Sequence, residues 1–172
     1  MELLKCELTL ADDRWVNLDD EASNEYLVRK YLLKNKAITA RFIPLKNEKR
    51  TAKMGQIKSE NIFKEIKLPL DVIVLGMGSD GHTASLFPCS NELKEAMDPN
   101  YPNFLISTNP KTAPYERISL SAKTISSSKK IFLHLNGSDK LHVLKTAMHL
   151  KDINKMPIYN FLKEELDIYW SP

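Results

Sequence analysis

Cysteine and long apolar segments are both scarce in this sequence. Cys6 and Cys89 are the only cysteines in 172 residues, and they lie far apart without metal-ligand spacing. Two isolated thiols suit a reducing cytosol better than a disulfide framework. No apolar stretch reaches the roughly 18 to 20 residues of a membrane span, and the first residues have no signal-peptide core. We therefore expect a cytoplasmic protein without a membrane partner.

The sequence also lacks any concentration of one charge sign. It has 25 basic and 22 acidic residues, for a net charge of +3, which is typical of a mixed, solvated surface. Residues 46–53 come nearest to a basic run and are interpreted as a solvated loop, so no nucleic-acid partner is expected. With 42% hydrophobic residues, residues 1–172 suit a single domain with a real core.

Glycine is scarce too, and its distribution is uneven. Three of the five glycines directly follow or lie near the end of one apolar run, residues 71–75: they are Gly76, Gly78 and Gly81. The β-branched run is typical of a parallel strand buried on both faces by helices. The glycines give the backbone the freedom to turn after this strand and to let a ligand approach closely.

The turn after this strand carries two groups that can handle protons, Asp80 and His82. Residues 83–87 are predicted to begin a helix, whose N-terminal amides would favour negative charge. On position alone, His82 is equally compatible with a structural imidazole bonded to the turn. The combination of strand end, glycine turn, acid and imidazole nevertheless makes residues 71–88 the candidate site.

Strand and helix patterns alternate along the rest of the chain. Strands are predicted at 5–11, 40–44, 104–107, 117–121, 130–135 and 167–170. Helices are predicted at 24–34, capped by Ser23, and at 51–66, 91–97, 138–150, capped by Ser138, and 158–166. This pattern predicts a Rossmann-like α/β fold with a mainly parallel sheet and helices on both faces. Ligands bind beyond the carboxyl ends of such strands, where residues 12–14, 76–82 and 136–140 are expected to converge.

Two other kinds of site fit these residues less well. The three glycines formally satisfy a dinucleotide fingerprint, but the next predicted strand runs into Thr108 and Asn109 without the carboxylate that would hold a ribose. No metal-ligand spacing is present, and the remaining histidines are interpreted as structural or surface residues: His134, His142 and His149. No cofactor or metal is therefore expected.

Several segments closely resemble the 6-phosphogluconolactonases. The strongest is LGMGSDGHTASLFP, and LTLADDRWV, PYERISLS, KKIFLHLNGSDK and MPIYNFL with the terminal IYW resemble further family segments in the same order. Five blocks in register are more specific than one glycine motif. The resemblance implies an α/β fold of the NagB/6-phosphogluconolactonase type. It also implies hydrolysis of 6-phospho-D-glucono-1,5-lactone to 6-phosphogluconate in the oxidative pentose phosphate pathway, without a cofactor.

The resemblance also implies roles for particular residues. His82 would act as a general base toward a water that attacks the lactone carbonyl, and Asp80 would orient the imidazole. Backbone amides of the turn, including that of Gly78, or the Arg14 side chain would stabilise the developing oxyanion. Arg117 and Lys140 match the positions expected to hold the 6-phosphate of the sugar-phosphate substrate.

The related glucosamine-6-phosphate deaminases are the enzymatic alternative. They have a similar Asp-Gly-His turn, but their pattern places a glutamate just before the proline that closes the motif. This chain has Phe87 there, and a phenyl ring cannot transfer a proton. The lactonase interpretation is therefore preferred.

Family members also begin with a further segment that holds a Ser-Gly-Gly phosphate loop, which this sequence does not contain. The resemblance accordingly implies a lactonase domain that is truncated at its N-terminus. We expect apolar surface or an unpaired edge beside residues 72–75, and a monomer or weak homo-oligomer. The alternative function is a catalytically impaired sugar-phosphate-binding domain.

Overall fold

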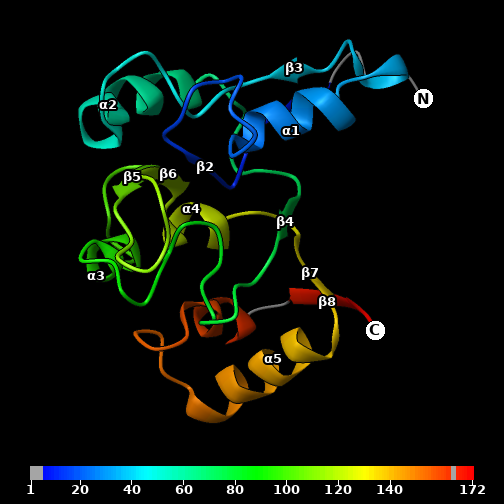
Figure 1. Cartoon of the computed structure of the whole chain (residues 1–172), viewed down its shortest axis with the longest axis vertical. Helices are drawn as coiled ribbons and strands as arrows, with labels where there is room; N and C mark the ends of the chain where they lie inside the picture. Colours follow the sequence, from blue (N-terminus) through cyan, green and yellow to red (C-terminus); the bar gives the residue numbers. More distant parts are fainter. Residues whose placement is uncertain (1–5, 164–165) are drawn as a thin grey trace.

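The computed structural model describes residues 6–163 and 166–172, in which strands and helices alternate along most of the chain (Figure 1). The strands are β1 (Glu7–Leu8), β2 (Asp12–Arg14), β3 (Arg41–Phe42), β4 (Ile73–Leu75), β5 (Leu105–Thr108), β6 (Arg117–Leu120), β7 (Ile131–Asn136) and β8 (Leu166–Ser171). The helices are α1 (Asn24–Tyr31), α2 (Ala52–Phe63), α3 (Leu93–Ala96), α4 (Ala122–Ser126) and α5 (Ser138–Leu150), with the short 3₁₀ helices η1 (Asn35–Ala37) and η2 (Pro157–Lys163). Among these residues, no helix is long and apolar enough to cross a membrane.

The strands form three small sheets rather than one. β4, β7 and β8 are parallel, with Val74 opposite Phe132, and β1 and β3 are also parallel. The third sheet, β2-β6-β5, is antiparallel, which the prediction of a mainly parallel sheet does not include. For β5 and β6 the reason lies in the connection, because residues 109–116 are too short for the crossover that a parallel pair needs.

A helix forms in each of the five predicted segments outside the glycine turn, α4 is an additional helix that the pattern did not predict, and two details of the prediction are wrong. The Ser23 hydroxyl accepts a hydrogen bond from the Tyr26 amide and caps α1, as expected. The cap of α5 is Gly137, with φ 92°, so Ser138 is the first helical residue rather than the cap. The helix predicted at residues 83–87 does not form, because Ala84 has φ 48° and Thr83 pairs with Leu86 in a bridge.

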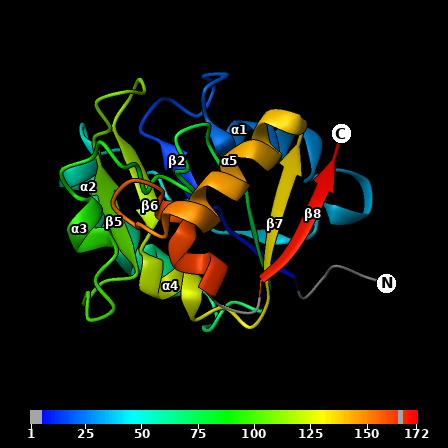
Figure 2. The ribbon, with the colours of Figure 1, turned by 90° about the horizontal axis from the view of Figure 1, so that it is seen from below.

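One face of the β4-β7-β8 sheet is covered by helices. α5 and η2 contact this sheet at β7 and β8, as Figures 1 and 2 show. Leu75 and Leu133 belong to the continuous core, together with Phe161 of η2. The alternation of the strand places Ile131, Leu133 and Leu135 on this covered face and Phe132 on the other.

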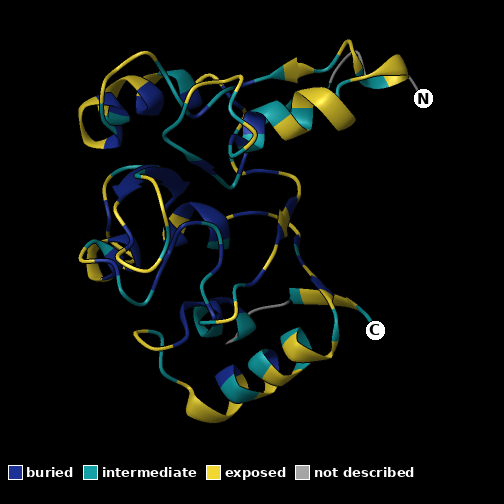
Figure 3. Cartoon of the chain, viewed as in Figure 1, coloured by how far each residue is buried: buried dark blue, intermediate teal, exposed yellow. Residues whose placement is uncertain are grey.

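The other face of β4 is open in the described structure (Figure 3). Val72 and Val74 are 54% and 60% exposed, whereas Ile73 and Leu75 are buried. The apolar surface expected beside residues 72–75 is therefore present, and helices do not cover both faces of this strand in the described part of the chain. A cavity of about 800 Å³ lies on this side, between residues 6–11 and residues 70–74.

Candidate active site

The segment after β4 folds into a tight loop at the predicted site. The Gly78 amide donates to the His82 carbonyl oxygen at 2.8 Å, and the Gly81 amide donates to the Gly78 carbonyl oxygen at 3.1 Å. The Ile158 amide donates to the Gly81 carbonyl oxygen at 2.9 Å, which ties the loop to η2. Gly81 has φ 75°, a conformation that favours glycine. Residues of the turn are thus fixed by bonds within the loop and to the neighbouring helix.

Gly78 allows the imidazole of His82 to lie directly against the backbone. A Cβ atom at residue 78 would lie 2.1 Å from both Cε1 and Nδ1 of His82, which is impossible without moving the ring. This contact explains the glycine without any ligand, and the Gly78 amide already has an acceptor within the loop. The assignment of Gly78 as a substrate-binding residue stays a prediction.

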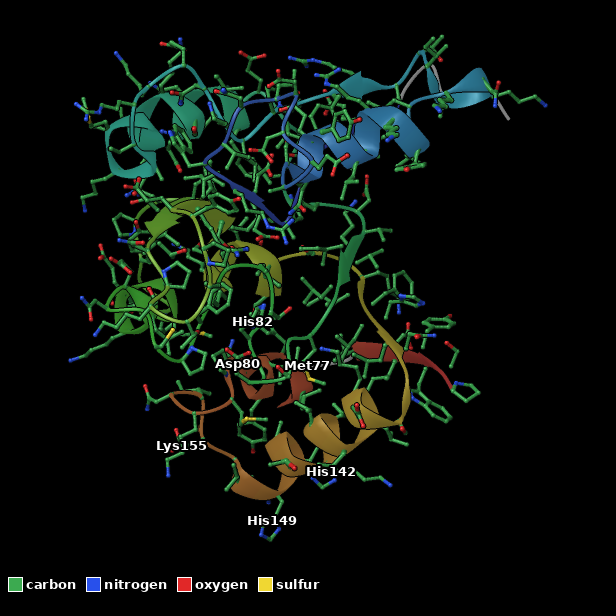
Figure 4. All side chains as sticks on the ribbon, viewed as in Figure 1. Met77, Asp80, His82, His142, His149 and Lys155 are labelled. Carbon is green, nitrogen blue, oxygen red and sulfur yellow. The ribbon has the colours of Figure 1, made fainter. Side chains whose placement is uncertain are left out.

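Asp80 and His82 form the acid/base pair that their spacing suggested (Figure 4). His82 Nδ1 lies 2.5 Å from Asp80 Oδ1, and the His82 amide donates to the same oxygen at 3.2 Å. Burial opposes ionisation of Asp80, but the hydrogen bond and charge of His82 outweigh it and hold the pKa of Asp80 below its usual range. A charged Asp80 favours the tautomer with the proton on Nδ1. Nε2 is then the acceptor nitrogen, and it has no hydrogen-bond partner among the described residues.

Phe87 completes the surroundings of the imidazole. Its ring stacks on the His82 ring with centroids 3.9 Å apart and planes 24° apart. The guanidinium carbon of Arg117, on β6, lies 5.1 Å from the centroid of the same phenyl ring. From the sequence alone, Phe87 serves only to argue against a deaminase, because a phenyl ring cannot transfer protons. The position of Phe87 five residues after His82 does not predict that the two rings stack.

Arg117 is a buried guanidinium with incomplete pairing. Its Nη1 lies 3.8 Å from Asp12 Oδ2, its Nη2 donates to the Pro114 carbonyl oxygen at 3.4 Å, and its Nε has no partner among the described residues. Burial, together with the charge of Arg14, lowers the pKa of Arg117, although Asp12 opposes the shift. A buried cation with unused donors is suited to an anion, because its hydrogen bonds and charge both remain to be satisfied.

Arg14 is held beside α1 by a network centred on Asp13. The buried Asp13 carboxylate accepts hydrogen bonds from the backbone amides of Arg14, Asn24 and Glu25, at 2.8, 2.7 and 3.3 Å. Burial outweighs these bonds and raises the pKa of Asp13 to about 6. The Arg14 guanidinium donates to Asn24 Oδ1 at 2.5 Å and to the Ala22 carbonyl oxygen at 3.2 Å.

Ser85 joins the histidine turn to Asp12, at the start of β2, although the two residues are 73 positions apart in the sequence. The Ser85 hydroxyl donates to Asp12 Oδ2 at 2.5 Å, and the Ser85 amide donates to the Ser119 hydroxyl at 3.1 Å. Asp12 therefore lies between Ser85 and Arg117. The sequence placed Asp12 near the site but singled out neither Ser85 nor Ser119, since a serine carries no signal of its partner.

The structure thus brings together Asp80, His82 and Arg117, and the charge of Arg14 acts on Arg117. Lys140, on the first turn of α5, has no described contact with these residues, and its assignment stays a prediction. In the described part of the chain, no group of three or more histidine, cysteine, aspartate or glutamate residues is placed to hold a metal ion.

The fold and the site define an α/β protein with its polar site at the carboxyl end of a parallel strand, the usual position in such sheets. Sequence comparison narrows this class. The family model of glucosamine-6-phosphate isomerases/6-phosphogluconolactonase matches residues 1–170, and the chain belongs to that family.

Individual relatives agree with this assignment. A 6-phosphogluconolactonase of Pseudomonas aeruginosa is 38% identical over 165 residues, which cover 96% of this chain and 69% of the relative. One of Rhizobium meliloti is 38% identical over 171 residues, or 98% and 74% of the two chains. The crystal structure of a 6-phosphogluconolactonase from Shewanella baltica is 43% identical and covers 100% of this chain and 74% of its own, with a TM-score of 0.97.

Proposed function

We propose that this chain hydrolyses 6-phospho-D-glucono-1,5-lactone to 6-phosphogluconate, the lactonase step of the oxidative pentose phosphate pathway. The observation that carries the proposal is the Asp80–His82 pair, in which Nδ1 is bonded to a carboxylate and Nε2 is left as a base. The relatives named 6-phosphogluconolactonase support the choice of substrate. The balanced charge of the chain supports a small-molecule substrate rather than a nucleic acid, and we place the chain in the cytoplasm as a monomer or weak homo-oligomer.

In this proposal, Nε2 of His82 takes a proton from a water molecule as its oxygen attacks the lactone carbonyl carbon. The imidazolium that forms is stabilised by the charged Asp80 carboxylate. Collapse of the tetrahedral intermediate breaks the bond between the carbonyl carbon and the ring oxygen. The ring oxygen accepts the proton from Nε2 and becomes a hydroxyl group. The product is a carboxylic acid, which releases one proton at neutral pH.

The sugar phosphate would be held by the basic residues beside this pair. Arg117 has unused donors and lies against the phenyl ring that contacts His82. Arg14 lies directly opposite Arg117 in the pairing of β2 with β6, so two basic side chains share one region of the site. Such an arrangement is suited to a phosphate with up to two negative charges. Lys140 is proposed as a further phosphate ligand and Arg14 as an oxyanion donor, since the Gly78 amide already donates to the His82 carbonyl oxygen.

The test is hydrolysis of freshly generated 6-phosphogluconolactone, followed as proton release above the spontaneous rate. We expect activity from the unaltered chain, loss to the spontaneous rate in His82→Ala, and full activity in His142→Ala, which removes an exposed histidine of α5. Equal activity in His82→Ala and the unaltered chain would exclude His82 as the base. Release of ammonia from glucosamine 6-phosphate by the unaltered chain would overturn the assignment in favour of a deaminase.

A further inference from the structure

Phe87 lies over His82 because the chain reverses between them. The bridge between Thr83 and Leu86, with the Leu86 amide donating to the Thr83 carbonyl oxygen at 3.0 Å, turns the chain back. The Thr83 hydroxyl donates to the Gly76 carbonyl oxygen at 2.7 Å and fixes the returning segment to the end of β4. Phe87 is only 2% exposed, so its ring has little room to move.

The hydrogen bond to Asp80 does not by itself fix the imidazole. The ring turns about two side-chain bonds, Cα–Cβ and Cβ–Cγ, and the hydrogen bond constrains only the distance between Nδ1 and Asp80 Oδ1, so one combined motion of the ring remains. Asp80 is itself 36% exposed at the edge of the turn and is not packed rigidly on every side. The orientation of Nε2 therefore needs a second contact on the ring.

The phenyl ring supplies that contact. Nearly parallel planes at 3.9 Å leave the imidazole no freedom to tilt toward Phe87, and its Nδ1–Cε1 edge lies against the Gly78 backbone. The Asp80 bond, the Gly78 backbone and the Phe87 face together determine the ring position. The phenyl face restrains the tilt of the ring plane.

We propose that Phe87 is the positioning residue for His82, and that its ring also sets the spacing between this base and Arg117. The proposal rests on the proposed function, in which His82 is the base and Arg117 a phosphate ligand. The same phenyl ring contacts both groups, the imidazole by stacking and the guanidinium at 5.1 Å. A sugar phosphate held by Arg117 would then present its carbonyl carbon at a fixed place relative to Nε2.

The kinetic test replaces the ring with a branched aliphatic side chain. Phe87→Leu removes the flat face while keeping an apolar group, so we expect kcat to fall on the order of 10- to 100-fold with a smaller change in KM, because misplacing a catalytic group by about 1 Å can cost that much. Phe87→Tyr keeps the ring and should retain most of the activity. Phe63→Leu is the matched control, since Phe63 is fully buried in a separate aromatic pair with Phe104.

A readout independent of activity is the imidazole itself. Side-chain ¹H–¹⁵N spectra, assigned with His82→Ala, should show one fixed tautomer of His82 in the unaltered chain, in Phe87→Tyr and in Phe63→Leu. In Phe87→Leu a ring that moves away from Asp80 can exchange between its two tautomers, so the two nitrogen signals should move toward each other.

The outcomes separate the two proposals. Loss of kcat and averaged His82 signals in Phe87→Leu alone would support positioning. Unchanged His82 signals in Phe87→Leu would overturn the positioning proposal. This holds if kcat of Phe87→Leu is unchanged, and also if kcat falls as much in Phe63→Leu as in Phe87→Leu. If the unaltered chain has no lactonase activity but the His82 signals change only in Phe87→Leu, the proposed function fails and the positioning of the imidazole by Phe87 stands.

Discussion

The turn after β4 and the strand itself differ in how completely neighbouring residues cover and pair them. In the turn, the polar groups of Gly78, Gly81 and Thr83 are paired within the loop or with η2. In the strand, Val72 and Val74 face away from the core, and the described residues pair β4 only with β7. The geometry of the candidate site therefore depends on bonds of the turn and on the covered face of the strand, and not on the open face.

The first test of this contrast changes two carboxylates, Asp80 in the turn after β4 and Asp71 just before the strand. Asp80→Asn removes the charge that holds Nδ1 of His82, and we expect kcat to fall on the order of 10²- to 10⁴-fold. Asp71→Asn removes an exposed carboxylate paired with Lys129 at 2.6 Å and should leave kcat unchanged. Lactone hydrolysis measured in parallel with thermal unfolding decides the point; similar activities of the two variants would show that the turn carboxylate has no special part.

The second test compares neighbouring side chains of β4. Leu75 is 1% exposed within the core, so Leu75→Ala should lower the free energy of unfolding by about 2 to 5 kcal/mol. Val74 is 60% exposed, and Val74→Ala should change it by less than about 0.5 kcal/mol. Urea unfolding of both variants gives these values. A cost for Val74→Ala close to that of Leu75→Ala would mean that the open face is covered in solution.

Much of this fold is predictable from local patterns. The Ser23 cap, the apolar run of residues 71–75 and the alternation of residues 117–121 each indicate the element found there, but not its burial, because β4 is exposed on one face and all four residues of β6 are buried. α4 was missed although Ser121 caps it by accepting from the Thr124 amide. That helix is short, and its signal lies within a serine-rich stretch that is typical of a loop.

The site itself was predictable only in part. The Asp80–His82 pair follows from a two-residue spacing in a turn, and local geometry is enough to produce it. The absence of a helix at residues 83–87 depends on the Thr83 bond to Gly76 and the Ser85 bond to Asp12, and the second of these joins residues 73 positions apart. The stack of Phe87 on His82 is a consequence of that reversal, so no local pattern indicates it.

The third test uses the pH dependence of stability that arises from the buried carboxyl of Asp13. The pKa of Asp13 is about 6 in the folded chain against an ordinary value of 3.8, so the folded state binds the proton more tightly. The contribution of this carboxyl to the free energy of unfolding therefore falls as pH rises from below 4 to above 6, by roughly 3 kcal/mol.

This effect is isolated by comparing the unaltered chain with Asp13→Asn, which does not titrate. The unaltered chain should lose stability relative to the variant as pH rises through this window, as measured by urea unfolding at several pH values. A difference that is independent of pH, or that grows in favour of the unaltered chain, would show that the backbone hydrogen bonds outweigh the burial of the carboxylate.

The smallest expected effect distinguishes two glycines that are separated by one residue, at the junction between strand and turn. At Gly78 an added methyl group would meet the His82 ring at 2.1 Å, whereas at Gly76 nothing lies within 4 Å. Gly78→Ala should therefore displace the imidazole and lower lactone hydrolysis on the order of 10-fold or somewhat more, and Gly76→Ala should leave it nearly unchanged. The two chains differ only in where one methyl group stands, so general loss of helix or strand propensity cannot explain a difference between them. If Gly78→Ala keeps full activity with an unmoved His82 spectrum, the turn is more yielding than its internal hydrogen bonds indicate, and the imidazole is placed by Asp80 and Phe87 alone.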